Sequence, residues 1–287
     1  MTKAPLYHVI RGSGPVLLLM LGGAADADAA GAFVDCLSHA FTVITYDRRG
    51  QARSPLERPD QRIEIETHGG DAHELLAALT DQPAYVFGSS IGALIALDLA
   101  LRFPHQVSTV VAHEPPLSRL LPEAERPATS LVELYRREGK AAINTFAASI
   151  GIDRSGIGVK LADHSKATSN LRFFLEQDAP AAGRYNLDLN ALKRPPTRIV
   201  VAGGSAGRQY FPYKSAARLG ELLKIEFVQF PGPHAGYVSD AHAFAIRLEQ
   251  LLRSDDRIDA AARAARSGSL LQGTMTGMLS PVGIGAS

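Results

Sequence analysis

The hydrophobic and polar positions of the chain alternate between short apolar runs and longer amphipathic stretches. Val16–Leu21 is apolar at every position, which is typical of a strand buried on both faces of a parallel sheet. We expect strands at Leu6–Ile10, Val16–Leu21, Phe41–Tyr46, Ala84–Phe87, Val107–Ala112, Thr197–Ala202 and Ile225–Phe230. We expect helices at about Ala30–His39, Asp71–Leu79, Ala93–Arg102, Tyr213–Leu223 and Asp240–Leu252. This alternation predicts an α/β fold with a mostly parallel sheet that is covered on both faces.

Three segments depart from the alternation. The Gly- and Pro-rich stretch 11–15 predicts a hairpin between the first two strands. Residues 115–190 open with several prolines and continue with mixed helical segments, which predicts a helical lid inserted into an α/β core of residues 1–114 and 191–253. We expect residues 254–287 to form a C-terminal extension with one more helix to about Arg266 and a mobile tail.

Composition excludes several classes of function. Thirty Lys and Arg residues nearly balance 29 Asp and Glu residues, so no strong field favours nucleic acid or an anionic membrane. The single cysteine, Cys36, cannot form an intrachain disulfide, and residues 1–10 lack the pattern of a signal peptide. We therefore expect a cytoplasmic protein that acts on a small molecule. Its oligomeric state is left open by the sequence.

One motif carries chemistry most directly. Gly88-Ser89-Ser90-Ile91-Gly92 follows a predicted strand and precedes a predicted helix. The G-x-S-x-G pattern makes a sharp strand-to-helix turn that exposes a nucleophilic serine, and its glycines leave room for the neighbouring backbone. A second match, 203–207, centres on Ser205 but is not followed at once by a helix. We therefore predict Ser90 as the nucleophile.

A histidine in a loop after the last predicted strand is the expected general base. His234 lies in Pro231-Gly232-Pro233-His234-Ala235, which is too rich in Gly and Pro for regular structure. Such a loop would bring an imidazole to the carboxyl edge of the sheet, beside Ser90. The other eight histidines lack such a position, and we expect four of them to be surface or capping residues, namely His68, His73, His105 and His242.

These motifs together resemble the α/β-hydrolase family, in its esterase-like branch. The resemblance covers roughly residues 6–252 and includes the strand with its glycine loop, the turn at Asp47–Ser54, the serine motif and the final histidine loop. It implies a catalytic triad and no cofactor. No pattern typical of a metal site or a dinucleotide site is present in the sequence.

The acid departs from the commonest pattern of that family. An aspartate usually follows the strand that is here Thr197–Ala202, but this chain has 203–207 there, without a carboxylate. Some branches take the acid from the end of the preceding strand, where this chain has Glu114. We predict Glu114 as the triad acid, with simple ion pairing near the lid as the alternative.

The resemblance also implies an oxyanion hole made of two main-chain N–H groups. One belongs to Ile91, the residue after the nucleophile. The other belongs to the loop after the first long strand, where we choose Gly23, with Ala24 as the alternative. The charged turn Asp47-Arg48-Arg49-Gly50 is interpreted as structural.

Three functions fit these residues. The first is hydrolysis of an ester or lactone through an acyl-enzyme on Ser90. The second keeps the same triad but performs cofactor-free lyase or perhydrolase chemistry, because a fold does not fix a function. The third is a non-catalytic protein that binds a small molecule, which the missing carboxylate after Thr197–Ala202 keeps open.

Overall fold

The computed structural model describes residues 5–58, 60–152, 164–193 and 197–254. The chain divides into two compact units, Met1–Arg247 and Leu248–Ser287. In the second unit the description covers 248–254, which are helical. The predicted helix and mobile tail of the C-terminal extension lie outside the described residues.

Seven strands of the described residues form one mixed sheet in the order β1-β3-β2-β4-β5-β6-β7. All neighbouring pairs are parallel except β1 with β3. The strands are β1 (His8–Arg11), β2 (Val16–Met20), β3 (Thr42–Tyr46), β4 (Ala84–Ser89), β5 (Val107–His113), β6 (Arg198–Gly204) and β7 (Phe227–Phe230). The predicted mostly parallel α/β sheet is confirmed.

The hairpin predicted at 11–15 is wrong, because β1 pairs with β3 and not with β2. Gly12 and Gly14 have positive φ angles of 81° and 121°. A Cβ on Gly12 would lie 2.2 Å from the main-chain oxygen of Ser38. The turn therefore packs closely on the segment before β3, and β3 takes the place next to β1.

Helices cover both faces of the sheet. On one face α3 (Ile91–Arg102) is almost entirely buried and packs with α2 (Ile65–Leu79) and α8 (Phe211–Leu223) in a large hydrophobic cluster. On the other face Phe87 of β4 meets Phe33 of α1 (Gly31–Leu37), with ring centroids 5.7 Å apart. Neighbouring residues of β4 thus point to opposite cores, as expected for a strand buried on both sides.

Helix α2 begins six residues earlier than the predicted start at Asp71. The main-chain N–H of Glu64 donates to Oγ1 of Thr67 at 3.3 Å, so one main-chain donor at the start of the helix has an acceptor. Position 69, inside the helix, requires a glycine, because a Cβ there would lie 2.0 Å from the Asp98 carboxylate on α3. Glycine, a poor helix former, is therefore needed here for close helix packing.

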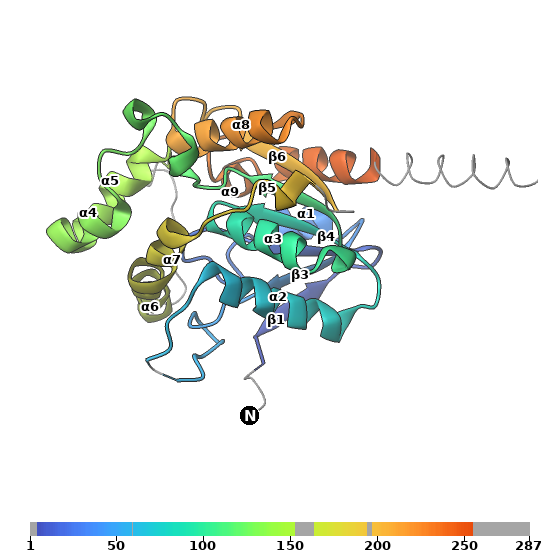
Figure 1. The fold of residues 1–287 in the computed structure, drawn as a ribbon. Helices are drawn as coiled ribbons and strands as arrows, with labels where there is room; N and C mark the ends of the chain where they lie inside the picture. The colour runs from blue at the N-terminus through green and yellow to red at the C-terminus, as the bar shows by residue number, and fades with distance from the viewer. Residues whose placement is uncertain (1–4, 59, 153–163, 194–196, 255–287) are drawn as a thin grey trace, which may run out of the picture. The chain divides into compact units, whose positions relative to one another are not determined.

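The segment between β5 and β6 is helical, and Figure 1 shows α4 to α7 gathered at one side of the sheet, where α7 contacts α3. Its elements are η2 (Ser118–Leu120), η3 (Glu123–Glu125), α4 (Leu131–Glu138), η4 (Gly139–Ala141), α5 (Ala142–Ser149), α6 (His164–Phe173), the π-helical turn η5 (Phe174–Asp178), α7 (Ala179–Arg184) and η6 (Ala191–Lys193). We call this segment the helical insertion. That it works as a lid stays a prediction.

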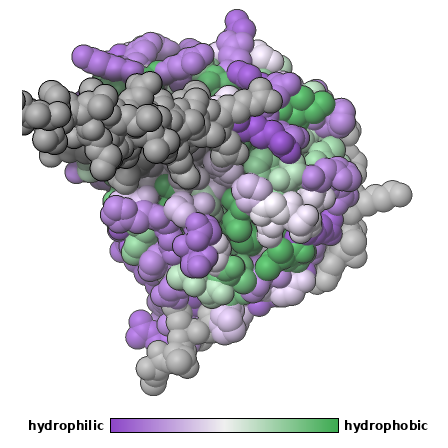
Figure 2. All heavy atoms as spheres, turned by 90° about the vertical axis from the view of Figure 1, so that its right-hand side faces the viewer, coloured by the Kyte–Doolittle hydropathy of each residue, from purple (hydrophilic) through white to green (hydrophobic). Residues whose placement is uncertain are grey.

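The described residues show no unusual gathering of large exposed hydrophobic side chains. Figure 2 shows hydrophilic and hydrophobic residues interspersed over one face. Four large hydrophobic side chains are exposed in the described part, namely Tyr7, Ile10, Val238 and Ile246. Scattered apolar side chains of this kind are normal for a protein surface. No helix in the described part is long and apolar enough to span a membrane.

Candidate active site

Ser90 occupies a strained turn between β4 and α3. Its backbone has φ 56° and ψ −123°, a conformation that residues with a Cβ rarely adopt. Gly88 and Gly92 are needed on either side. A Cβ on Gly88 would lie 2.4 Å from the Gly92 oxygen, and a Cβ on Gly92 would lie 1.9 Å from the Met20 oxygen. The turn therefore holds the serine at the start of a buried helix.

Glu114 and His234 come together across 120 positions of the sequence. Oε2 of Glu114 lies 2.5 Å from Nδ1 of His234, and Oε1 accepts the main-chain N–H of Gly204 at 2.8 Å. Glu114 is fully buried and His234 is 4% exposed. Glu114 directly follows β5 and has a positive φ of 49°. The carboxylate thus holds the imidazole by one oxygen and is itself held by the other.

The electrostatics of this pair favour an ionised carboxylate. Burial acts to raise the pKa of Glu114, but the hydrogen bond to His234 and the nearby His113 and Gly204 outweigh it and lower the pKa. Burial lowers the pKa of His113 to about 4, despite the neighbouring Glu114 charge. His113 is therefore a neutral neighbour at physiological pH.

The nucleophile and this pair share one edge of the sheet. The main-chain N–H of Ser90 donates to the His113 oxygen at 2.9 Å, and Glu114 is the next residue. Gly204 lies against the histidine loop, since a Cβ there would be 2.6 Å from the Pro233 oxygen. No hydrogen bond joins the side chains of Ser90 and His234 among the described residues.

The loop after β2 lies directly beside the serine. A Cβ on Gly22 would be 2.8 Å from the Cβ of Ser90, and Gly23 has a positive φ of 56°. In the described part of the chain, the main-chain N–H groups of Gly23 and Ile91 have no acceptor. Both predicted oxyanion donors are therefore without a protein acceptor among the described residues.

A cavity of about 480 Å³ opens at Ser90. Ser90 and Ile91 form part of its wall, and the helical insertion supplies much of the rest. Its apolar lining includes Leu131, Val132, Phe146, Phe174 and Phe211. A cavity of this size and lining suits a small organic molecule.

The alternative serine lacks these features. Ser205 is exposed at the end of β6, and its N–H donates to the Phe230 oxygen at 2.8 Å. The next helix, α8, begins only at Phe211. Ser205 therefore has no strained turn into a helix, which agrees with the choice of Ser90.

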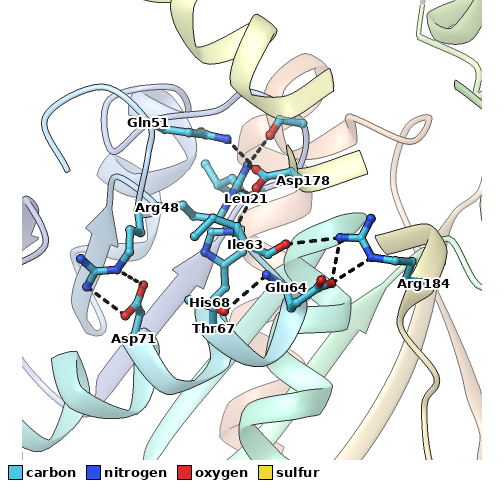
Figure 3. Close-up of polar contacts among 12 residues, drawn as sticks. Leu21, Arg48, Gln51, Ile63, Glu64, Thr67, His68, Asp71, Asp178 and Arg184 are labelled. Carbon is cyan, nitrogen blue, oxygen red and sulfur yellow. Dashed lines mark hydrogen bonds and ion pairs between the residues drawn. The ribbon is translucent and has the colours of Figure 1, made fainter. Parts of the chain in front are cut away.

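The prediction for His68 is wrong, because it is buried at 1% exposure and neither a surface nor a capping residue. Its Nε2 lies 3.0 Å from Oδ1 of Asp178, at the end of η5 in the helical insertion. Asp178 also accepts from Arg48 at 3.2 Å and from Gln51 at 2.7 Å (Figure 3). No sequence motif marks His68 or Asp178, and Asp178 lies far from the others along the chain.

Asp47 and Arg49 in the turn at Asp47–Gly50 bind neighbouring side chains, as the structural interpretation of this turn expects. Asp47 binds Arg53, with Nε–Oδ2 at 2.6 Å, and Arg49 binds Asp71 at 2.8 Å. Among the described residues no three His, Cys, Asp or Glu side chains gather as a metal site would require.

Comparisons with known proteins agree with this architecture. A family model described as alpha/beta hydrolase fold matches residues 15–155. An uncharacterized hydrolase of Bacillus subtilis, YraK, is 39% identical over 259 residues, which cover 88% of this chain and 94% of the relative.

Solved structures with lower identity show the same fold. A meta-cleavage product hydrolase from Pseudomonas fluorescens is 18% identical, with a TM-score of 0.67 over 87% of this chain and 94% of that chain. An enol-lactonase from Burkholderia xenovorans is 18% identical, with a TM-score of 0.65 over 86% and 96% of the two chains.

Proposed function

Because the chain belongs to the alpha/beta hydrolase fold family, we propose that it is a serine hydrolase that cleaves a carboxylic ester or lactone through an acyl-enzyme on Ser90. One observation carries the proposal. The strained Ser90 and the buried Glu114–His234 pair lie at the same edge of the sheet, and two main-chain N–H groups near Ser90 have no acceptor among the described residues. Such a set of groups suits acyl transfer.

The roles follow from which atoms are already engaged. Nδ1 of His234 is bound to Glu114, so Nε2 is the nitrogen left to accept the Ser90 proton. The serine oxygen then attacks the acyl carbon, and the carbonyl electrons move to an oxyanion held by the N–H groups of Ile91 and Gly23. His234 returns the proton to the leaving alcohol. Water, activated by the same imidazole, then hydrolyses the acyl-enzyme.

Glu114 supports this cycle electrostatically. It stays ionised because its pKa is lowered, so its charge stabilises the imidazolium that forms when His234 takes a proton. The apolar cavity of about 480 Å³ supports a small-molecule substrate with an apolar acyl or alcohol part.

A labelling experiment tests the nucleophile. We expect a fluorophosphonate probe to label the wild-type protein on the peptide that contains Ser90. Ser90→Ala should abolish the label, and Ser205→Ala, the matched control from the second motif, should keep it. Labelling that survives Ser90→Ala, or none in the wild type, would overturn the proposal.

A substrate panel tests the reaction. p-Nitrophenyl esters of increasing acyl length and simple lactones should be hydrolysed by the wild type and by Ser205→Ala, but not by Ser90→Ala. A protein that labels at Ser90 yet hydrolyses none of them would favour the lyase or perhydrolase alternative. A protein that neither labels nor hydrolyses would favour the binding protein.

A further inference from the structure

A buried arginine holds the loop that carries the predicted oxyanion donor. The Arg48 side chain is 3% exposed. Its Nη1 donates to the Leu21 oxygen at 2.6 Å, and its Nη2 donates to the Gly23 oxygen. One guanidinium thus binds two main-chain carbonyls of the same loop. Figure 3 shows Arg48 among these contacts, between the loop and Asp178.

The two carbonyls bracket one peptide unit. In a planar trans peptide, the C=O of one residue and the N–H of the next are fixed in opposite directions. Arg48 therefore fixes the orientation of the Leu21–Gly22 and Gly23–Ala24 units. The Gly22–Gly23 unit, which contains the predicted oxyanion N–H, lies between them. Glycines adopt many backbone conformations, so this loop depends on such contacts for its shape.

Asp178 holds Arg48 in turn, from a different part of the fold. Its carboxylate is fully buried and accepts from Arg48, Gln51 and His68. Burial acts to raise the pKa of Asp178, but His68 and Arg48 outweigh it and lower the pKa, so the carboxylate is ionised. Asp178 ends a π-helical turn, an element often found at functional sites.

The insertion residues around Asp178 line the cavity at Ser90. Phe174, Ala179 and Pro180 all belong to its wall. The contact between Asp178 and Arg48 therefore connects the wall of the substrate cavity with the oxyanion loop. This connection matters for catalysis, because electrostatic stabilisation requires hydrogen-bond donors that are already in place when charge develops.

We propose that Arg48 and Asp178 are positioning residues, which orient the oxyanion loop and fix the helical insertion against it. This inference rests on the proposed function. Neither residue belongs to the wall of the cavity at Ser90. Their effect is on the transition state through the Gly23 N–H, and it should leave ground-state binding nearly unchanged.

The test compares two buried Arg–Asp pairs of neighbouring arginines. Asp178→Asn weakens the pair of Asp178 with Arg48, while Asp71→Asn weakens the pair of Asp71 with Arg49. The side chains of the second pair are both 1% exposed, and the carbonyls of the oxyanion loop accept from Arg48. The readouts are kcat and KM for p-nitrophenyl butyrate, the melting temperature, and Ki for an aryl trifluoromethyl ketone. The ketone adds to the serine and places an oxyanion in the hole.

We expect Asp178→Asn to lower kcat roughly 10-fold or more and to raise Ki by a similar factor, with KM within roughly 3-fold of wild type, since loss of a whole donor costs about 10²–10³. Asp71→Asn should lower the melting temperature without these changes. Arg48→Lys should behave like Asp178→Asn, because an ammonium group cannot reproduce the fixed fork of the guanidinium.

Several outcomes overturn the inference. It is wrong if Asp178→Asn folds with wild-type kcat and Ki, or if Asp71→Asn changes both as strongly. It is also wrong if Asp178→Asn and Arg48→Lys are both unfolded while Asp71→Asn folds, since the pair then serves stability alone. Fluorophosphonate labelling of the wild type separates the two proposals. With labelling intact, these outcomes reject only the positioning role, and without labelling both proposals fail.

Discussion

Replacing Glu114 by Gln removes one charge and changes almost no volume. The hydrogen bonds of Glu114 determine the orientation of the amide group in this variant. The site of Oε1 faces the Gly204 N–H at 2.8 Å, so it must hold the amide oxygen. The amide nitrogen then takes the site of Oε2 and faces Nδ1 of His234. An NH2 group there needs an acceptor, so Nδ1 loses its proton and Nε2 gains it.

That tautomer cannot accept a proton from Ser90. We therefore expect kcat to fall by roughly 10²–10⁴, the range for an acid that orients the imidazole and stabilises the imidazolium. Loss of a charged hydrogen bond should also cost about 2 kcal/mol of stability. Both effects depend on the Gly204 N–H, which fixes the direction of the amide.

The assay is the pH profile of kcat/KM for a p-nitrophenyl ester, together with the melting temperature. Glu226→Gln is the control, since Glu226 is exposed and precedes β7, whereas the His234 loop follows that strand. A folded Glu114→Gln variant with activity within roughly 5-fold of wild type would refute the reasoning, because the wrong tautomer should cost far more.

Other variants test separate parts of the site. Ser90→Ala and His234→Ala should each lower kcat by roughly 10⁴ or more, and the double variant should be no slower than either, because the two act as one unit; a much slower double variant would contradict this. Gly92→Ala should abolish folding or lower the melting temperature strongly, because its Cβ would lie 1.9 Å from a main-chain oxygen, whereas Gly31→Ala, with open space, should melt like wild type; equal melting of the two would be the contrary result. The folded-state pKa of His113 lies at about 4, below the ordinary 6.5, so stability should fall as pH drops from 6.5 to 4, by roughly 2–3 kcal/mol. The free energy of unfolding of His113→Asn, measured with urea, should fall less over this pH range than that of the wild type. An equal fall in both proteins would show that His113 does not cause it.

Much of the fold was predictable, because a parallel sheet leaves a strong local signal. Val16–Leu21 and Val107–Ala112 are apolar throughout since both of their faces are buried, and the predicted strands correspond to β2 and β5. The partner of β1 was not predictable in this way. A Gly-rich connection indicates a turn, but which strand lies next to β1 depends on packing over Ser38 and Phe41.

The site likewise contains residues that the sequence predicts and residues that it does not. Ser90 and His234 lie in motifs with a recognisable local pattern, so their neighbourhood could be proposed from the sequence alone. His68 and Asp178 lie in no motif. Their contact at 3.0 Å joins a helix of the core to the insertion, and only the folded chain brings them together.

The buried carboxylate of Asp178 limits how far the helical insertion can be exchanged between relatives. A chimera that replaces residues 115–190 by another insertion keeps Arg48 in the core but removes its counter-charge. Breaking a buried pair in this way costs about 3–5 kcal/mol, which is a large share of the 5–15 kcal/mol that stabilises a typical domain. Insertions from relatives would therefore be compatible only if they bring a carboxylate to the same place, so the segment that shapes the cavity is not an independent module.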